Sequence, residues 1–332
     1  MTIPLEKLDT VLQNTLIKAN LTSAHKIIQL SESSIRQEGN ITKEDAKLIL
    51  ELAAETLLPQ ENISAVRMRL KQNTTLSTGC DQIDLILNGG IPLQGITELS
   101  GESSCGKTQL CLQLCLTVQY PTSVGGLNKG AVFISTEDNF PSKRLQQLIQ
   151  NFPLEFSKSV VSQLEENHNF GSKIFIEHIG DTDGLKRCLY GQLPRLLSTQ
   201  DIGLLIIDSI AGVFRADYDL KDGLRRARDM RSVASQLQKI AHDHSIVILC
   251  VNQVAASLKQ SGLSSKPIPA LGLVWANLVT TRIFMSRSTI GNFRTLEVLF
   301  APHLPKKSCQ FTIDLLGFRH LTTEYNSNRS IC

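Results

Sequence analysis

Eight consecutive residues, 101–108, have the types and spacing most clearly suited to chemistry. They read Gly-Glu-Ser-Ser-Cys-Gly-Lys-Thr, which matches the phosphate-binding pattern G-x-x-x-x-G-K-[ST]. The two glycines let backbone N–H groups curl around phosphate oxygens. Lys107 supplies a positive charge for the β- and γ-phosphates, and Thr108 supplies a hydroxyl for Mg²⁺. We therefore expect ATP and Mg²⁺ as cofactors, with nucleotide-binding residues Gly101, Glu102, Ser103, Ser104, Cys105, Gly106, Lys107, Thr108 and Gln109.

The segments on either side of this loop support the interpretation. Residues 96–99 form a short β-rich run, and residues 109–119 have apolar residues at helical spacing. The loop is therefore predicted between a strand and a helix N-terminus, where the helix dipole attracts anions. A chance match by a glycine turn would not be expected in this context.

Two acidic residues follow other predicted strands and complete a nucleotide site. Asp208 ends the apolar run 204–207, and Glu137 follows the run 131–135. Asp208 at the end of a buried strand is predicted to bind Mg²⁺ together with Thr108. Glu137 is predicted to orient or deprotonate the attacking water as a general base. Taken singly, Asp208 could be a turn residue and Glu137 a solvated loop acid.

Two further residues are candidates with open alternatives. Gln253 ends the next strand and could sense the γ-phosphate, which would make it catalytic together with Lys107 and Glu137, or it could simply be a polar strand terminus. Arg144 could stack on adenine through its planar guanidinium, or it could form a surface ion pair.

Two segments are candidates for DNA binding. Residues 215–231 are rich in arginine, although acidic residues dilute their charge, and residues 255–272 form a long loop rich in Ser, Gly and Pro. Both follow strands at their carboxyl ends, where ligands bind in open α/β sheets. The alternative is a solvated helix face and a loop without function. The candidate DNA-binding residues are Lys221, Arg225, Arg226, Arg228, Arg231, Lys259 and Lys266.

The composition is that of an ordinary globular chain. The 332 residues are 42% hydrophobic and 20% charged, with a net charge of +3, so nucleic-acid binding would need a local patch. The eight cysteines include no C-x-x-C pair, which favours a reducing compartment. No apolar run is long enough to span a membrane, and no secretory leader is apparent, so we expect no membrane partner.

The periodicity predicts four parts. Residues 1–58 form a small helical domain. Leu8, Val11, Leu12, Thr15 and Leu16 fit one helical face, further helices are expected over 23–30 and 42–57 with Thr42 as an N-cap, and a turn is expected at 38–40. Residues 59–78 are a polar linker, residues 79–322 form the large α/β domain, and residues 323–332 form a flexible tail.

Within the large domain, strands and helices are predicted to alternate. The runs 131–135, 174–179, 204–208 and 246–251 are typical of buried parallel strands, and helices are expected over 143–151, 184–197 and 224–242. The runs 278–285, 294–300 and 308–313 indicate antiparallel hairpins at one sheet edge. The predicted fold class is α/β, with a mostly parallel sheet and C-terminal antiparallel hairpins.

Four segments make the chain resemble the eukaryotic RecA-type recombinase paralogues. They are Gly95–Pro121 (GITELSGESSCGKTQLCLQLCLTVQYP), Thr136–Leu148 (TEDNFPSKRLQQL), Gly171–Asp183 (GSKIFIEHIGDTD) and Ala301–Pro305 (APHLP). The resemblance covers most of residues 1–320. It implies a RecA-like P-loop ATPase core preceded by a small all-α domain, with the nucleotide, metal and DNA roles given above.

The resemblance also implies a cellular role. Family members assemble head to tail with ATP near the protomer junctions, and they act in homologous recombination repair in the nucleus. For this chain it implies a weak, DNA-stimulated ATPase. The expected partners are another paralogue, the recombinase filament and single-stranded or branched DNA, and the expected location is the nucleus, with some protein in the cytoplasm.

Two departures from the recombinase pattern bear on assembly. The recombinase carries a Phe-x-x-Ala hook in its linker, but here every Phe lies at or after Phe133. The recombinase has an Asp at the start of its nucleotide-capping segment, whereas this chain has Ala301-Pro302. Both departures predict a chain that ends an assembly rather than one that polymerises.

The favoured function is therefore an ATP-binding repair paralogue in a hetero-oligomer. The rivals are a strand-exchange ATPase that forms its own filaments, and a scaffold with a vestigial ATP site. The absent linker Phe argues against the first, and the intact loop with Glu137 and Asp208 argues against the second. A small-molecule kinase is disfavoured because no acceptor loop or lid is evident.

Overall fold

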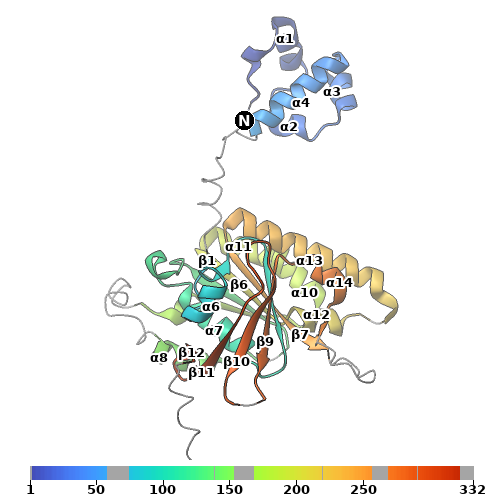
Figure 1. Ribbon diagram of the computed structural model, residues 1–332. Coiled ribbons are helices and arrows are strands. Elements are labelled where there is room, and N and C mark those ends of the chain that lie inside the picture. Colours follow the sequence, from blue (N-terminus) through green and yellow to red (C-terminus); the bar gives the residue numbers. More distant parts are fainter. Residues whose placement is uncertain are drawn as a thin grey trace, which may run out of the picture. The chain divides into compact units, whose positions relative to one another are not determined.

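The computed structural model describes residues 2–57, 75–137, 139–152, 168–218, 220–255, 268–289 and 291–321. The chain divides into two compact units, Met1–Gln72 and Asn73–Cys332. Both are drawn in Figure 1. The division falls inside the predicted linker 59–78, most of which lies outside the described residues, as does the predicted tail 323–332.

The first unit is a cluster of short helices around one apolar core. Its core contains Leu16, Ile27, Ile35 and Ile49, all fully buried. The helices are the 3-10 turn η1 (Leu5–Lys7), α1 (Thr10–Lys18), α2 (Ala24–Ile28), α3 (Glu32–Gly39) and α4 (Lys43–Leu57).

Capping residues set where two of these helices begin and end. The hydroxyl of Thr42 accepts a hydrogen bond from the backbone N–H of Asp45 at 3.2 Å and donates one to its carboxylate at 2.7 Å, so Thr42 caps α4. Helix α3 was not predicted. The turn expected at 38–40 is confined to Asn40, whose left-handed φ of 48° ends that helix.

The second unit is built on a ten-stranded sheet with strand order β12-β11-β10-β9-β3-β7-β6-β4-β5, in which β8 pairs with β7. Strands β9, β3, β7, β6, β4 and β5 are mutually parallel, whereas β9 to β12 form consecutive antiparallel hairpins. This confirms the predicted fold class. The strands are β3 (Ile96–Gly101), β4 (Gly130–Ser135), β5 (Ile174–His178), β6 (Ile202–Asp208), β7 (Val247–Ala255), β8 (Ile268–Pro269), β9 (Thr281–Arg287), β10 (Arg294–Phe300), β11 (Ser308–Asp314) and β12 (Gly317–His320).

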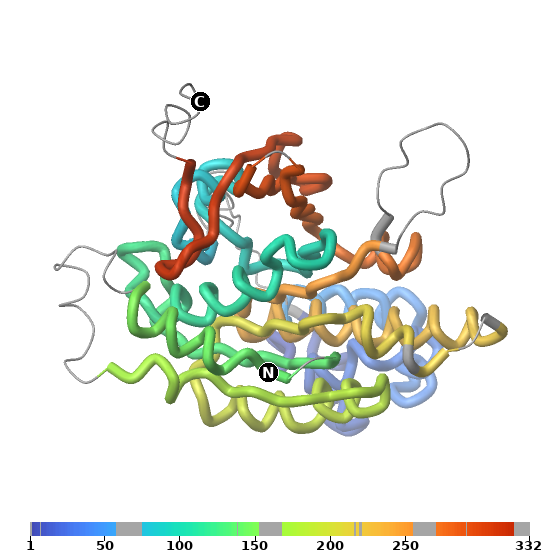
Figure 2. Tube along the Cα trace, turned by 90° about the horizontal axis from the view of Figure 1, so that it is seen from below, coloured from blue at the N-terminus to red at the C-terminus, as the bar shows by residue number. Residues whose placement is uncertain are grey.

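The central strands are apolar on both faces because two separate cores flank the sheet. Along β6, Leu204 and Ile206 belong to one core, and Leu205 and Ile207 belong to the other. Figure 2 shows the helices on both sides of the strands. The first core is covered by α6 (Asp81–Ile86), α7 (Lys107–Thr117) and α8 (Ser142–Asn151), and the second by α10 (Thr182–Arg187), α11 (Leu193–Thr199), α12 (Ile210–Ala216), α13 (Gly223–His244) and α14 (Gly272–Ala276).

One predicted helix is interrupted. The helix expected over 184–197 is split into α10 and α11 by a π-helical segment, Cys188–Gln192. Pro194 explains the irregularity, because it has no N–H to donate to the carbonyl of Tyr190 in a regular α-helix. Strands β8 and β12 were also not predicted. The remaining short elements are β1 (Thr75–Leu76), β2 (Ile91–Pro92), η2 (Thr122–Val124), η4 (Phe170–Lys173) and η6 (Leu220–Asp222).

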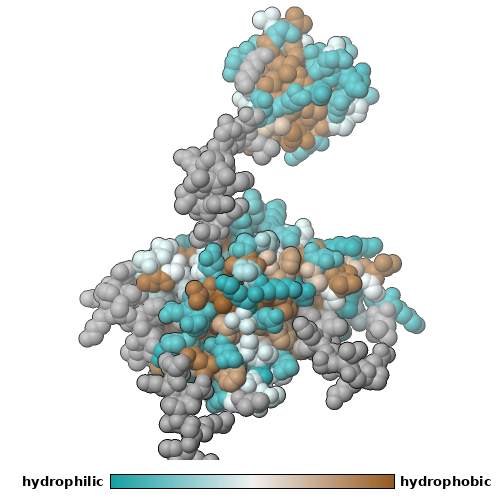
Figure 3. All heavy atoms as spheres, in the orientation of Figure 1, coloured by the Kyte–Doolittle hydropathy of each residue, from teal (hydrophilic) through white to brown (hydrophobic). Residues whose placement is uncertain are grey.

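Several apolar side chains remain at the surface of each unit. Figure 3 shows brown, apolar residues on the visible face of the helical unit. The exposed large apolar residues described in this unit are Val11, Ile17, Ile28 and Leu48. Val11, which the sequence places on one helical face with Leu12 and Leu16, is 75% exposed, whereas those two leucines are buried. Across the described residues, no helix combines the length and apolarity needed to cross a bilayer.

Candidate nucleotide site

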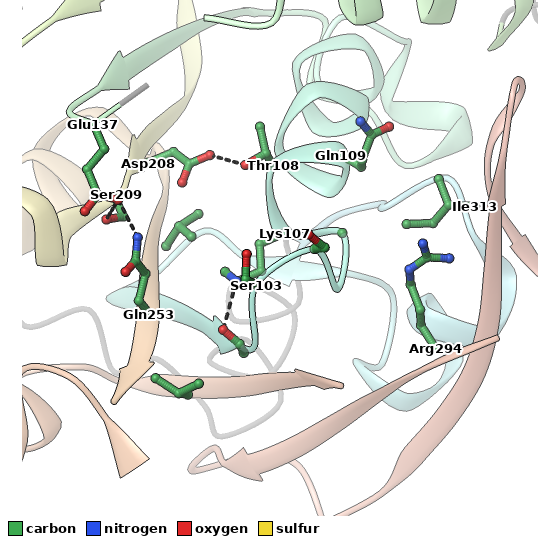
Figure 4. Close-up of a pocket in the computed structure, with 15 residues that line it drawn as sticks. Ser103, Lys107, Thr108, Gln109, Glu137, Asp208, Ser209, Gln253, Arg294 and Ile313 are labelled. Carbon is green, nitrogen blue, oxygen red and sulfur yellow. Dashed lines mark hydrogen bonds between the residues drawn. The ribbon is translucent and has the colours of Figure 1, made fainter. Parts of the chain in front are cut away.

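A cavity of about 600 Å³ lies at the carboxyl ends of β3, β6 and β7. Figure 4 shows the side chains that line it. The lining combines the predicted phosphate loop with residues far apart in sequence. Its members are Gly101, Ser103, Ser104, Gly106, Lys107, Thr108, Gln109, Glu137, Asp208, Ser209, Val251, Gln253, Val254, Arg294 and Ile313.

The loop 101–108 connects β3 to α7, as the sequence predicts. Gly106 has φ of 108°, which is left-handed, and a Cβ there would lie 2.4 Å from the Cδ1 of Ile313. Only glycine fits this position, because both the backbone and the packing exclude a side chain. The loop therefore ends tightly against the C-terminal strands, at the N-terminus of α7, where backbone donors favour a phosphate.

The ammonium of Lys107 lies across its own loop. Its Nζ donates to the carbonyl of Gly101 at 2.8 Å and to that of Glu102 at 2.7 Å. These contacts hold the cation where an incoming phosphate would meet it. The thiol of Cys105 is buried beneath it, and burial raises the pKa of that thiol despite the nearby lysine, which keeps the thiol neutral.

Thr108 and Asp208 meet as predicted. The hydroxyl of Thr108 donates to Oδ2 of Asp208 at 2.6 Å, which joins the first turn of α7 to the end of β6. A hydroxyl and a carboxylate oxygen are suitable Mg²⁺ ligands, and Mg²⁺ typically takes few protein ligands and completes its shell with phosphates and water. The donor set therefore fits the ion, and these two residues would hold it.

The carboxylate of Glu137 is held by three side chains. Its Oε2 accepts from Ser209 Oγ at 3.0 Å and from Gln253 Nε2 at 2.5 Å, while Oε1 accepts from Arg215 at 2.6 Å. Arg215 also donates to Oε1 of Gln253 at 2.7 Å, which closes a ring of three residues. Glu137 and Gln253 are thus brought together, and Arg215 connects both to the end of α12.

Close backbone packing makes room for this ring. A Cβ on Gly212 would lie 2.6 Å from the Cγ of Glu137 and 2.8 Å from the hydroxyl of Thr136. Thr136 in turn donates to the carbonyl of Ser209 at 2.6 Å and accepts from its N–H at 2.9 Å. The ends of β4 and β6 are therefore tied together beneath the carboxylate.

A buried ion pair fixes the strand that leads to Gln253. Glu98, fully buried on β3, accepts from Arg282 on β9 at 2.7 Å and from Asn252 on β7 at 2.7 Å. A buried charge is tolerated only when it is paired and hydrogen-bonded. These contacts link β3, which leads into the loop, β7, which carries Gln253, and β9, which begins the C-terminal hairpins.

Arg144 contacts the loop side of the site without lining the cavity. Its Nε donates to the Gln109 amide oxygen at 2.7 Å, and its Nη2 donates to the carbonyl of Asp314 at 2.6 Å. Burial lowers the pKa of the guanidinium, although Asp314 opposes this. The planar group therefore joins α7 to the turn before β12, and its stacking on adenine stays a prediction.

The candidate DNA-binding residues fall into two groups. Lys221, Arg228 and Arg231 are exposed on η6 and α13. Arg225 is also exposed and lies over the ring of Tyr218 at 5.7 Å, whereas the Nε of Arg226 is buried without a hydrogen-bond partner among the described residues. Lys259 and Lys266 lie outside the described residues.

Tyr218 is a residue that sequence reasoning missed. Its hydroxyl donates to Asp229 at 2.5 Å, and burial together with that carboxylate raises its pKa to about 12, so it stays protonated. Lys186 also donates to Asp229 at 2.5 Å. Tyr218 lies within the segment 215–231, so the sequence did contain an aromatic residue close to Arg225 as a signal.

Comparison of the sequence with known protein families identifies the class of protein that these features define. The profile of the Rad51 family matches residues 69–320, most of the chain. The chain therefore belongs to the Rad51 family of RecA-like, ATP-binding recombination and repair proteins. This confirms the resemblance drawn from the four sequence segments.

Within that family, the chain is similar to particular named proteins over three quarters or more of its length. It is 38% identical over 320 residues to DNA repair protein XRCC3 of Bos taurus, which covers 91% of this chain and 93% of the relative. It is 32% identical to the XRCC3 homolog of Arabidopsis thaliana, over 75% of this chain. It is 30% identical to the meiotic recombination protein DMC1 of Saccharomyces cerevisiae, over 92% of this chain and 85% of the relative.

Proposed function

We propose that this protein is an ATP-binding recombinase paralogue that acts in homologous recombination repair of double-strand breaks and crosslinks. It would work in the nucleus, with some protein in the cytoplasm, within a heteromeric paralogue complex that binds DNA and assists the recombinase filament. The observation that carries the proposal is the complete site: loop, Thr108–Asp208 pair and held Glu137 meet in one cavity. Similarity to proteins named for DNA repair supports the pathway.

The chemistry expected at this site is a slow, DNA-stimulated hydrolysis of ATP. Bound Mg²⁺ would neutralise charge that develops on the phosphates. Lys107 would bind the β- and γ-phosphates, and Glu137 would take a proton from the attacking water. In the present arrangement, both oxygens of Glu137 accept hydrogen bonds from Arg215, Gln253 and Ser209. These three donors stabilise the ionised carboxylate and so make it a weaker base toward the attacking water, which favours slow turnover.

A partner is supported by the surface of the ATPase unit. Among the described residues, β5 is a sheet edge that pairs only with β4, and Ile176 in its centre is 47% exposed. An open strand edge with an exposed apolar residue is a template for association. The linker without Phe argues that one half of a head-to-tail contact is absent, so growth should stop after one addition.

Light scattering after size exclusion tests the proposal. The chain purified alone should aggregate or give low yield, and co-expression with a recombinase paralogue should give one soluble complex of fixed stoichiometry. The reason is that a retained association surface stays exposed until a partner covers it. A monomer whose melting temperature does not depend on a partner would contradict the hetero-oligomer, as would long filaments of the chain alone with ATP.

Charge reversal tests the DNA assignment. Replacing Arg225, Arg226 and Arg228 with Glu should weaken binding to single-stranded DNA, with little dependence on sequence. Each lost phosphate contact should lower the slope of log affinity against log salt by roughly 0.7. Arg195→Glu, an exposed position on α11, is the matched control and should leave the slope unchanged. If the folded triple variant keeps the wild-type slope of log affinity against log salt, these residues do not contact DNA and belong to a solvated face.

A further inference from the structure

The cavity contains a second cation that no sequence motif indicated. Arg294 begins β10 and lines the cavity together with Ile313 of β11. Figure 4 shows Arg294 and Ile313 on one side of Lys107, and Glu137 and Gln253 on the other. The cavity therefore has two ends, with Arg294 at the end away from the candidate general base.

The two ends would receive different parts of a nucleotide. Asp208 and Glu137 are the groups suited to Mg²⁺ and to the attacking water, so the terminal phosphate belongs at their end. The loop and the N-terminus of α7 bind the middle of the phosphate chain. The α-phosphate and nucleoside must then extend toward Gln109, Arg294 and Ile313.

The side chain of Arg294 is short of hydrogen-bond acceptors. Its Nε is buried and has no hydrogen-bond partner among the described residues. Burial, and then the neighbouring Arg287, lower the pKa of its guanidinium. A buried donor without an acceptor is destabilising, so an acceptor on a ligand would be favoured here.

The position of this side chain is fixed by packing. The Cδ of Arg294 lies 3.7 Å from where a Cβ on Gly106 would be, and Ile313 is closer still. The aliphatic part of Arg294 thus lies against Gly106, the residue that precedes α7. A guanidinium placed in this way needs little reordering to bind a ligand on the loop.

We propose that Arg294 binds the α-phosphate of the nucleotide from within the same chain. This inference rests on the proposed function, because it assumes that the cavity takes ATP. A phosphate is the preferred ligand because it supplies both acceptor oxygens and negative charge to a guanidinium that has another arginine as its neighbour. ATP and ADP share the α-phosphate, so Arg294 should contribute equally to the binding of both nucleotides.

Calorimetric titration of the full chain with unlabelled MgATP and MgADP tests this inference. Arg294→Met keeps much of the aliphatic stem and removes the guanidinium, and it should raise the dissociation constants of both nucleotides by roughly 10- to 100-fold. Arg294→Lys should recover part of the loss, since it restores the charge. Arg195→Met is the matched control, because Arg195 is exposed on α11 and outside the cavity lining, and it should change neither constant by more than about 2-fold.

Each outcome separates the inference from the proposed function. A wild-type chain that binds neither nucleotide would overturn the proposed function itself. Wild-type binding with unchanged constants in Arg294→Met would overturn only the role of Arg294. A loss for ATP alone would place Arg294 at the terminal phosphate and contradict the assignment to the α-phosphate. If Arg294→Met does not fold, Arg294→Gln decides, since it also removes the charge: unchanged constants would overturn the role of Arg294, and an equal rise for both nucleotides would support it.

Discussion

In a Lys107→Ala variant, the affinity for ATP should fall by roughly 100-fold, equivalent to about 2.7 kcal/mol. Two charge-assisted contacts to phosphate oxygens are lost, and hydrogen bonds to charged groups are each worth about 1.5–3 kcal/mol. The fall is moderated because Lys107 must first give up its bonds to the carbonyls of Gly101 and Glu102. Equilibrium titration with a fluorescent ATP analogue measures the change.

The control for this experiment is another lysine. Lys47 is 74% exposed on α4 and faces Glu51 at 4.0 Å, so Lys47→Ala should leave ATP affinity unchanged. A melting curve without nucleotide shows whether the loop still folds in Lys107→Ala. If a folded Lys107→Ala protein binds ATP with wild-type affinity, the loop is not part of the nucleotide site.

Glu137→Gln should leave ATP binding nearly unchanged and lower the rate of hydrolysis by roughly 10²- to 10⁴-fold. The amide has the same shape as the carboxylate, and its oxygen can still accept from Arg215 or Ser209, so the side chain should keep its place although one bond of the ring is lost. What it loses is the ability to accept a proton from water. Single-turnover measurement of ADP formation, with ATP affinity measured on the same sample, separates the two effects.

Glu177 provides the comparison for this substitution. It is an exposed acid on the edge strand β5, and Glu177→Gln makes the same chemical change away from the cavity. Its hydrolysis rate should equal that of the wild type. A Glu137→Gln protein that hydrolyses ATP at the wild-type rate would assign the general base to another group.

The parts of the site that the sequence made predictable are those encoded locally. The loop 101–108 is one contiguous pattern, and Asp208 and Glu137 each follow a buried apolar run, so parallel-strand geometry places them at one sheet edge. Thr108 and Asp208, 100 residues apart, were paired correctly for this reason.

Residues brought in by tertiary packing could not be predicted in the same way. Arg215 reaches Glu137 across 78 residues, because α12 turns back over the end of β4. Arg294 arrives through the antiparallel hairpins, whose register no local pattern specifies. Arg215 had been read only as part of the basic segment 215–231, although its guanidinium faces the nucleotide cavity's carboxylate.

Survival of cells after crosslinking damage tests the central claim most directly. Cells that lack this protein should be sensitive to a crosslinking agent, wild-type protein should restore survival, and Lys107→Ala expressed at the same level should restore it less well. That ordering would join the nucleotide site to recombination repair. If cells that lack the protein repair crosslinks as well as normal cells do, the account is contradicted.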